Sequence, residues 1–247
     1  DYITTPYDLS LIPILSEYVS AWKVGSGDIT WHELIRTLSL DDKPLLIATG
    51  ASNMNEVELA MNAALKYTQD IVLMQCNTNY TASSENFKYI NLNVLKEYKA
   101  RYPDVILGLS DHTPGHATVL GAVAFGARVI EKHFTDDMMR EGPDHKFSMD
   151  FNSWKEMVDT TRELEVALGS KSKKIEDNEK ETVVLQRRAI RAKNDLQVGV
   201  SITRDMIEVL RPCPKNALPP YRIDEILGKT LINHIVSGEC VTWEDLK

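Results

Sequence analysis

LGLSDHT (residues 107–113) and RVIEKHFT (residues 128–135) are the two stretches that decide the predicted fold. Each begins as an apolar run and ends in polar side chains, and each carries a histidine near its end, His112 in the first and His133 in the second. Short, nearly continuous apolar runs are typical of strands covered on both faces of a parallel sheet. Ligands bind at the carboxyl ends of such strands, so the polar endings predict a functional site there.

The two histidines predict a metal site. Successive side chains of a strand point to opposite faces, so Ser110 shares a face with His112, and Glu131 shares a face with His133. Neighbouring parallel strands lie about 4.8 Å apart, which brings both imidazoles within reach of one divalent cation. Two imidazoles without a thiolate leave positions open for water or substrate, as in a catalytic rather than a structural site. The other four histidines are assigned no role.

Six apolar runs recur along the first 135 residues, and their starts lie about 20–35 residues apart. These predicted strands cover residues 2–5, 21–24, 44–49, 71–76, 105–110 and 128–134. The stretches between them have helical periodicity, for example NEVELAMNAALKY after a possible N-cap at Asn53 with Glu56 three residues on. This alternation predicts parallel βαβ units. Two architectures remain open at this point, a doubly wound sheet and a barrel that lacks its first two βα units.

The remainder of the chain predicts a second domain. Residues 151–169 form a long amphipathic pattern that ends at a glycine, and residues 170–186 are highly charged, which is typical of a linker with a helical stretch. From residue 187 the pattern alternates and turns at glycines, with one short helix that Thr203 opens. We therefore expect a small β-rich domain made of several short strands over residues 187–247.

Composition narrows the class of protein. The chain has 247 residues, of which 43% are hydrophobic and 26% charged, so it can bury a sizeable core. A net charge of −8 without a basic stripe argues against nucleic acid as a partner. No apolar run approaches the roughly 20 residues of a membrane span. Three widely spaced cysteines favour a reducing cytoplasm over a disulfide framework.

Polar residues at the ends of the other predicted strands indicate an anion site. KVGSGD (residues 23–28) joins a cation, Lys23, to a glycine-rich loop whose N–H groups can hold phosphate, although a GSG tripeptide alone is usually only a turn. Hydroxyls of Thr5, Thr78 and Ser110 end neighbouring strands. Asp144, in the loop after the sixth strand, can bind substrate hydroxyls.

Seven motifs occur in order along the first unit: TPYD, KVGSGD, TGAS, CNTNYT, GLSDHT, IEKHF and GPDHKFS. Together they resemble the sialic acid synthase family, and the tail from AKNDLQVGVSITRDMIEVLRPC through WEDL resembles the C-terminal antifreeze-like (SAF) domain of that family. The resemblance implies a TIM (β/α)8-type barrel lacking its first two βα units. The expected domains are a partial catalytic barrel over 1–169 (strands 3–8), a linker over 170–186 and an SAF domain over 187–247.

The resemblance also implies an activity, in which phosphoenolpyruvate and an N-acetylhexosamine such as N-acetylmannosamine condense to a nine-carbon α-keto acid and phosphate. His112 and His133 match the ligands of a manganese or magnesium ion. The positions that match the phosphoenolpyruvate site are Thr5, Lys23, Ser26, Thr78 and Ser110. Of these, we expect Lys23 to be catalytic, together with Glu131. Tyr80 and Asp144 match residues that contact the amino sugar. Arg211 matches an arginine that reaches the partner's barrel in a domain-swapped homodimer.

Three departures from the family pattern alter these expectations. Ala48 stands where many members have serine, and Thr78 replaces a serine or asparagine. The glutamate and lysine that the family's first two strands supply are not in this sequence. If the chain is complete as given, little or no turnover is expected.

Other readings remain open. The product can be N-acetylneuraminate, legionaminate, pseudaminate or a related nonulosonate, and the motifs favour a less common sugar. The chain can also be a non-catalytic sugar-binding or scaffold protein, or a metal-dependent hydrolase, although a hydrolase leaves the second domain unexplained.

Overall fold

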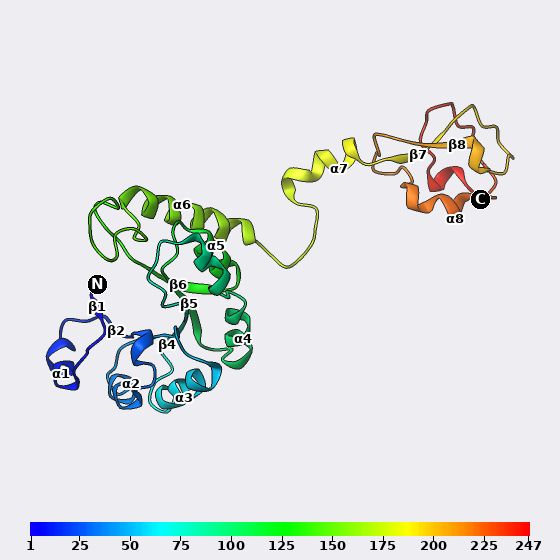
Figure 1. Ribbon diagram of the computed structural model, residues 1–247. Helices are drawn as coiled ribbons and strands as arrows, with labels where there is room; N and C mark the ends of the chain where they lie inside the picture. Colours follow the sequence, from blue (N-terminus) through cyan, green and yellow to red (C-terminus); the bar gives the residue numbers. More distant parts are fainter. The chain divides into compact units, whose positions relative to one another are not determined.

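Six parallel strands form the frame of the first part of the chain, in a computed structural model that describes residues 1–247 (Figure 1). Their order in the sheet is their order in the sequence: β1 (Ile3–Thr4), β2 (Ala21–Val24), β3 (Leu45–Ala48), β4 (Ile71–Cys76), β5 (Ile106–Asp111) and β6 (Ala127–Lys132). The helices α1 (Ile12–Leu15), α2 (His32–Ser39), α3 (Met54–Ala64), α4 (Val94–Arg101), α5 (Ala117–Ala124) and α6 (Phe151–Leu168) follow the strands in turn. This repeated βα order is that of a TIM-type barrel.

The sheet is curled rather than flat. Lys23 on β2 and Glu131 on β6 are separated by three intervening strands, and in a flat sheet four steps of about 4.8 Å would hold them about 19 Å apart. Their side chains instead meet, with Nζ 2.9 Å from the carboxylate. The open-sheet alternative is therefore wrong, and the predicted partial barrel with its six strands is confirmed.

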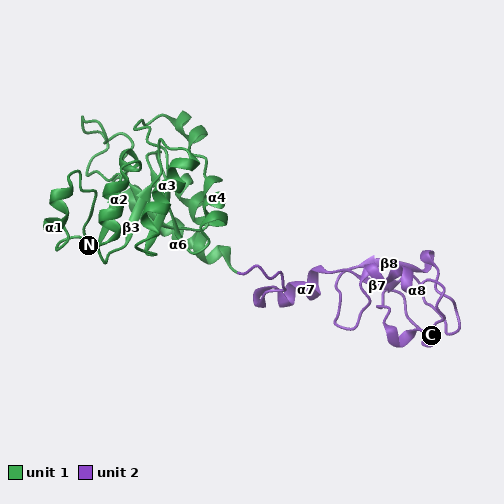
Figure 2. Ribbon diagram, turned by 90° about the horizontal axis from the view of Figure 1, so that it is seen from below, with its two compact units in different colours: residues 1–169 green, residues 170–247 purple.

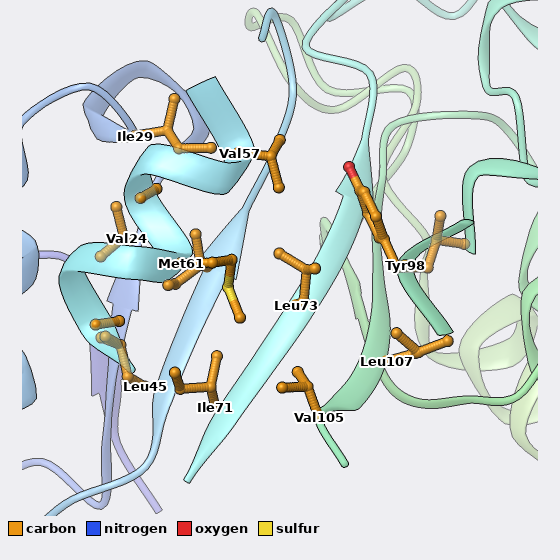
Figure 3. Close-up of a cluster of buried hydrophobic side chains, with 14 of the residues drawn as sticks. Val24, Ile29, Leu45, Val57, Met61, Ile71, Leu73, Tyr98, Val105 and Leu107 are labelled. Carbon is orange, nitrogen blue, oxygen red and sulfur yellow. The ribbon is translucent and has the colours of Figure 1, made fainter. Parts of the chain in front are cut away.

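The two faces of the sheet carry different side chains. The face toward the helices holds the main hydrophobic core, to which strand residues such as Val24, Leu45 and Leu73 contribute (Figure 3). The inner face holds a smaller apolar cluster around Leu46 and Met74. Because side chains alternate along each strand, the residues that follow this inner cluster toward the carboxyl ends, Lys23 among them, also point inward.

One helix start agrees with its predicted signal, whereas the first helix and the ends of two strands differ from the predictions. The predicted capping box of α3 is present, since Asn53 accepts from the Glu56 N–H and the Glu56 carboxylate accepts from the Asn53 N–H. The stretch with helical periodicity between the first two predicted strands forms only a 3-10 turn (Leu9–Leu11) and the four residues of α1. Strands β5 and β6 end one residue before His112 and His133, so both histidines lie at the start of the following loops.

Residues Ser170–Lys247 form the second unit (Figure 2). This unit has its own hydrophobic core. It contains α7 (Lys180–Gln186), an antiparallel pair β7 (Ala189–Ala192) and β8 (Ile207–Leu210), and α8 (Ile223–Ile226). The expectation of several further short strands was wrong, because isolated bridges such as Leu196↔Ile235 and Ser201↔Thr230 take their place. Thr203 precedes a 3-10 turn rather than an α-helix. No helix in the structure combines the length and apolar character that a bilayer crossing requires.

Candidate functional site

Charged and hydroxyl side chains meet at the carboxyl end of the inner face of the sheet. Lys23 Nζ lies 2.9 Å from both carboxylate oxygens of Glu131, and the Ser110 hydroxyl donates to Glu131 Oε1 at 2.9 Å. The Lys23 side chain is 12% exposed, whereas that of Glu131 is 42% exposed. Lys23 is thus paired with Glu131 at the carboxyl end of the inner face, which we call the inner rim. The exposure of Glu131 lets a ligand compete for Lys23.

The Cys76 thiol occupies the middle of this rim. It is buried at the end of β4, and burial raises its pKa. Hydrogen bonds with Ser26 and Ser110 and the charge of Lys23 act in the opposite direction without outweighing burial. Cys76 is therefore a protonated, small packing residue at neutral pH, around which the two serines and the lysine gather.

The loop after β2 brings two more of the predicted residues to the same place. Ser26, in a 3-10 helix over Ser26–Asp28, accepts a hydrogen bond from the Gly50 N–H at 2.9 Å. A Cβ atom at Gly50 would lie 2.5 Å from Thr78 Cγ2 and 2.8 Å from Ser26 Oγ, so only glycine lets these side chains approach. Thr5 lies next to the same loop, with its hydroxyl 3.9 Å from the position of a Cβ at Gly25.

The two predicted metal ligands stand side by side. The ring centroids of His112 and His133 are 5.1 Å apart, and Tyr80 and Phe147 pack against both rings. Nδ1 of His112 lies 2.8 Å from the carbonyl oxygen of Asn77, which can only accept, so this nitrogen carries the proton and Nε2 keeps its lone pair. Burial lowers the pKa of His112 and keeps its imidazole neutral at pH 7.

Asp144 and Tyr80 border the imidazole pair on its exposed side. Asp144 Oδ2 lies 3.7 Å from Nδ1 of His133, and the Asp144 side chain is 50% exposed. The centroid of the Tyr80 ring lies 4.2 Å from that of His112 with the ring planes tilted by 46°, and partial burial raises the pKa of the Tyr80 hydroxyl. Above the imidazoles, the Tyr80 hydroxyl can donate to or accept from a polar ligand, and the Asp144 carboxylate can accept from it. No three His, Cys, Asp or Glu side chains converge closely enough to hold a metal ion among themselves.

Arg211 belongs to the other unit of the chain. Its Nε donates to the Gln186 carbonyl at 2.6 Å, and its peptide bond to Pro212 is cis. The remaining predicted site residues, which all lie in the first unit, are brought together at the inner rim or at the imidazole pair.

Sequence reasoning missed three contributors to this site. Asn77 orients His112 through its backbone carbonyl, which no side-chain pattern reveals. Phe147 lies inside the GPDHKFS motif, but an aromatic residue in a loop carries no signal of its own. Cys76 ends a predicted strand, and its place two residues after Met74 is the signal that puts it on the inner face.

The burial of Cys76 predicts a slow thiol. At pH 8, N-ethylmaleimide should modify Cys76 at least about tenfold more slowly than the more exposed Cys213, because reaction needs an exposed thiolate. Raising the pH to 9.0, the ordinary pKa of the thiol, should still leave Cys76 mostly protonated. Peptide mass spectrometry over time measures both rates. Equal rates for the two cysteines would contradict the described packing of the rim.

Comparison with known proteins agrees with this arrangement. The family model described as the NeuB family matches residues 1–173, and that of the SAF domain matches residues 187–247. The chain is 34% identical to the N,N'-diacetyllegionaminic acid synthase of Legionella pneumophila over 100% of this chain and 69% of the relative. It is 32% identical to the synthase of the same name from Campylobacter jejuni, over 97% and 71%.

A solved structure extends the agreement to three dimensions. The N-acetylneuraminic acid (sialic acid) synthetase of Leptospira borgpetersenii, in complex with citrate, superposes with a TM-score of 0.66 at 27% identity, covering 72% of this chain and 62% of that one. The resemblance inferred from the seven motifs is thus confirmed by sequence and by structure. The chain belongs to the NeuB family of sialic acid synthases and ends in an SAF domain.

Proposed function

We propose that the first unit carries the condensing site of a nonulosonate synthase, which joins phosphoenolpyruvate to an N-acetylated amino sugar and releases phosphate. One observation carries the proposal. The cation Lys23, held by Glu131 and flanked by hydroxyls, lies on the same inner face of the sheet as the paired imidazoles. An anion rim and a two-histidine site on one face suit a reaction that needs a polyanionic donor and a polarised carbonyl.

The anion rim supplies the groups for phosphoenolpyruvate. Lys23 is the cation, and the hydroxyls of Ser26, Ser110, Thr5 and Thr78 supply hydrogen bonds. Glu131 neutralises Lys23, so an incoming phosphate or carboxylate exchanges one anionic partner of Lys23 for another. The displaced Glu131 carboxylate remains beside Ser110, where it can accept a proton during the reaction.

The donor set at His112 and His133 fits a divalent cation such as Mn²⁺ or Mg²⁺. Nδ1 of His112 is bonded to a backbone carbonyl, and Nδ1 of His133 faces the Asp144 carboxylate. Metal-binding histidines are usually oriented by such partners on the nitrogen that does not bind the ion. Lewis-acid polarisation of the sugar aldehyde is the chemistry that an ion supplies there.

The amino sugar is placed by residues at the rim of the imidazole pair. Tyr80 offers a ring face and a hydroxyl, and the half-exposed Asp144 offers acceptors for sugar hydroxyls. The two relatives named as diacetyllegionaminic acid synthases support a diacetamido sugar as the acceptor. Holding both substrates on one rigid sheet contributes to the rate through orientation.

The proposal includes a domain-swapped homodimer in the cytoplasm, in which Arg211 approaches the partner's site. The exposed position of Arg211 and the three free cysteines support these two points.

The proposal is tested in two steps on the 247-residue chain. Calorimetry should detect binding of phosphoenolpyruvate, and Mn²⁺ should bind in an electron paramagnetic resonance titration. Phosphate release and product mass are then followed with diacetamido, N-acetylmannosamine and pseudaminate-type sugars, and any release should be largest with the diacetamido sugar. Absence of both binding events would refute the proposal. Binding of both without phosphate release from any sugar would favour the non-catalytic sugar-binding alternative.

A further inference from the structure

Directly behind the imidazole pair, on the helix side of the sheet, lies a buried ion pair whose side chains hydrogen-bond only to each other, to Thr113 and to Thr118. Asp111 and Lys132 are register partners on β5 and β6, next in sequence to His112 and His133. Lys132 Nζ lies 2.6 Å from Asp111 Oδ2, and both side chains are 0% exposed. Period two turns these two side chains away from the inner rim, so Asp111 is not a metal ligand despite its place in the SDHT motif.

The pair is the centre of a closed hydrogen-bond network. Lys132 also donates to the carbonyl of Thr113 at 2.6 Å. The Asp111 carboxylate accepts from the Thr113 N–H at 3.2 Å, from the Thr113 hydroxyl at 2.8 Å and from the Thr118 hydroxyl at 2.7 Å. Thr118 lies in the first turn of α5. The network thus joins the ends of two strands to the start of the helix that connects them.

The hydrogen bonds of this network hold the residues on either side of His112 and the residue before His133. His112 lies between Asp111 and Thr113, and the side chain or backbone of each is bonded in the network. His133 directly follows Lys132, whose ammonium is anchored to the other strand end. A shift or twist of one strand end relative to the other would have to break several charge-assisted bonds at once.

A buried ion pair is poorly explained by stability alone, because its desolvation cost offsets much of its attraction and apolar residues of similar volume often replace it without loss. Its directional bonds do hold one geometry, which apolar contacts do not. We infer that Asp111 and Lys132 are positioning residues that set the spacing of His112 and His133 from behind the sheet. This inference rests on the proposed cation site.

The test uses the double substitution Asp111→Asn/Lys132→Met, which removes both charges at nearly unchanged volume and leaves the Thr113 and Thr118 hydroxyls an acceptor. The matched control is Leu38→Ala, a cavity substitution in the fully buried core under α2, which lowers stability without touching β5 or β6. Two readouts are compared in the whole chain: the Mn²⁺ dissociation constant, and the nuclear Overhauser effect between the His112 and His133 ring protons without metal.

The double variant should unfold within a few degrees of the wild type, bind Mn²⁺ at least tenfold more weakly and lose the effect between the rings. Leu38→Ala should unfold earlier and keep wild-type values for both readouts. Wild-type values of both readouts in the double variant would overturn the inference.

Two further outcomes are informative. If the double variant does not fold, Thr118→Val removes one bond to Asp111 and keeps the ion pair, and it should weaken Mn²⁺ binding about two- to threefold. Unchanged binding and an unchanged ring-to-ring effect in that variant would overturn the inference. If the wild type binds no Mn²⁺, the proposed function fails at its cation, and the positioning role is decided by the ring-to-ring effect alone.

Discussion

Replacing His112 by alanine is expected to weaken Mn²⁺ binding at least about a hundredfold, which corresponds to ~2.7 kcal/mol. The chain offers only two imidazoles at this place, and no third His, Cys, Asp or Glu side chain completes a set with them. Loss of one imidazole leaves a single neutral ligand, which holds a hydrated ion poorly. Any metal-dependent condensation should fall by a similar factor or more.

The control for this substitution is His234→Ala. His234 is exposed and lies in the second unit, so its removal should leave Mn²⁺ binding unchanged. His112→Ala also leaves the Asn77 carbonyl without its donor, which should cost about 1–2 kcal/mol of folding free energy. Both variants must therefore be compared below their unfolding midpoints. Equal Mn²⁺ affinity in His112→Ala and the wild type would remove the cation from the proposed function.

The second large effect is expected at Lys23. The substitution Lys23→Met should weaken phosphoenolpyruvate binding about a hundredfold, because the rim loses its only cation while Glu131 keeps its negative charge. The stability of the chain should change little, since Glu131 is 42% exposed and water can solvate its freed carboxylate. Calorimetric titration with phosphoenolpyruvate and with inorganic phosphate measures the loss.

Two companion variants sharpen this prediction. Lys155→Met removes an exposed lysine on α6 that pairs with Asp159, and it should leave phosphate binding unchanged. Glu131→Gln should act in the opposite direction to Lys23→Met and strengthen phosphate binding about threefold or more, because the amide neither repels the anion nor competes as strongly for Lys23. The same variant should lower turnover if Glu131 accepts a proton. Weaker phosphate binding in Glu131→Gln would contradict the exchange of partners proposed for the rim.

Much of the fold could be predicted because its signals are local. Each strand is a short apolar run, and the capping box at Asn53 and Glu56 fixes the start of α3 from four consecutive residues. The errors also have local causes. Pro13 and the short stretch around α1 did not support a full helix, and the second domain closes through single bridges that no alternation of residues distinguishes from strands.

The alternation of side chains along a strand was enough to predict that Ser110 shares a face with His112 and that Glu131 shares a face with His133, because it depends only on neighbouring residues. The contact of Lys23 with Glu131, 108 residues away, could not be predicted in this way, because it depends on how far the six strands curl. The pairing of Asp111 with Lys132 behind the imidazoles likewise depends on how β5 and β6 associate. Strand periodicity is a property of neighbouring residues, whereas curl and packing arise only when the strands associate.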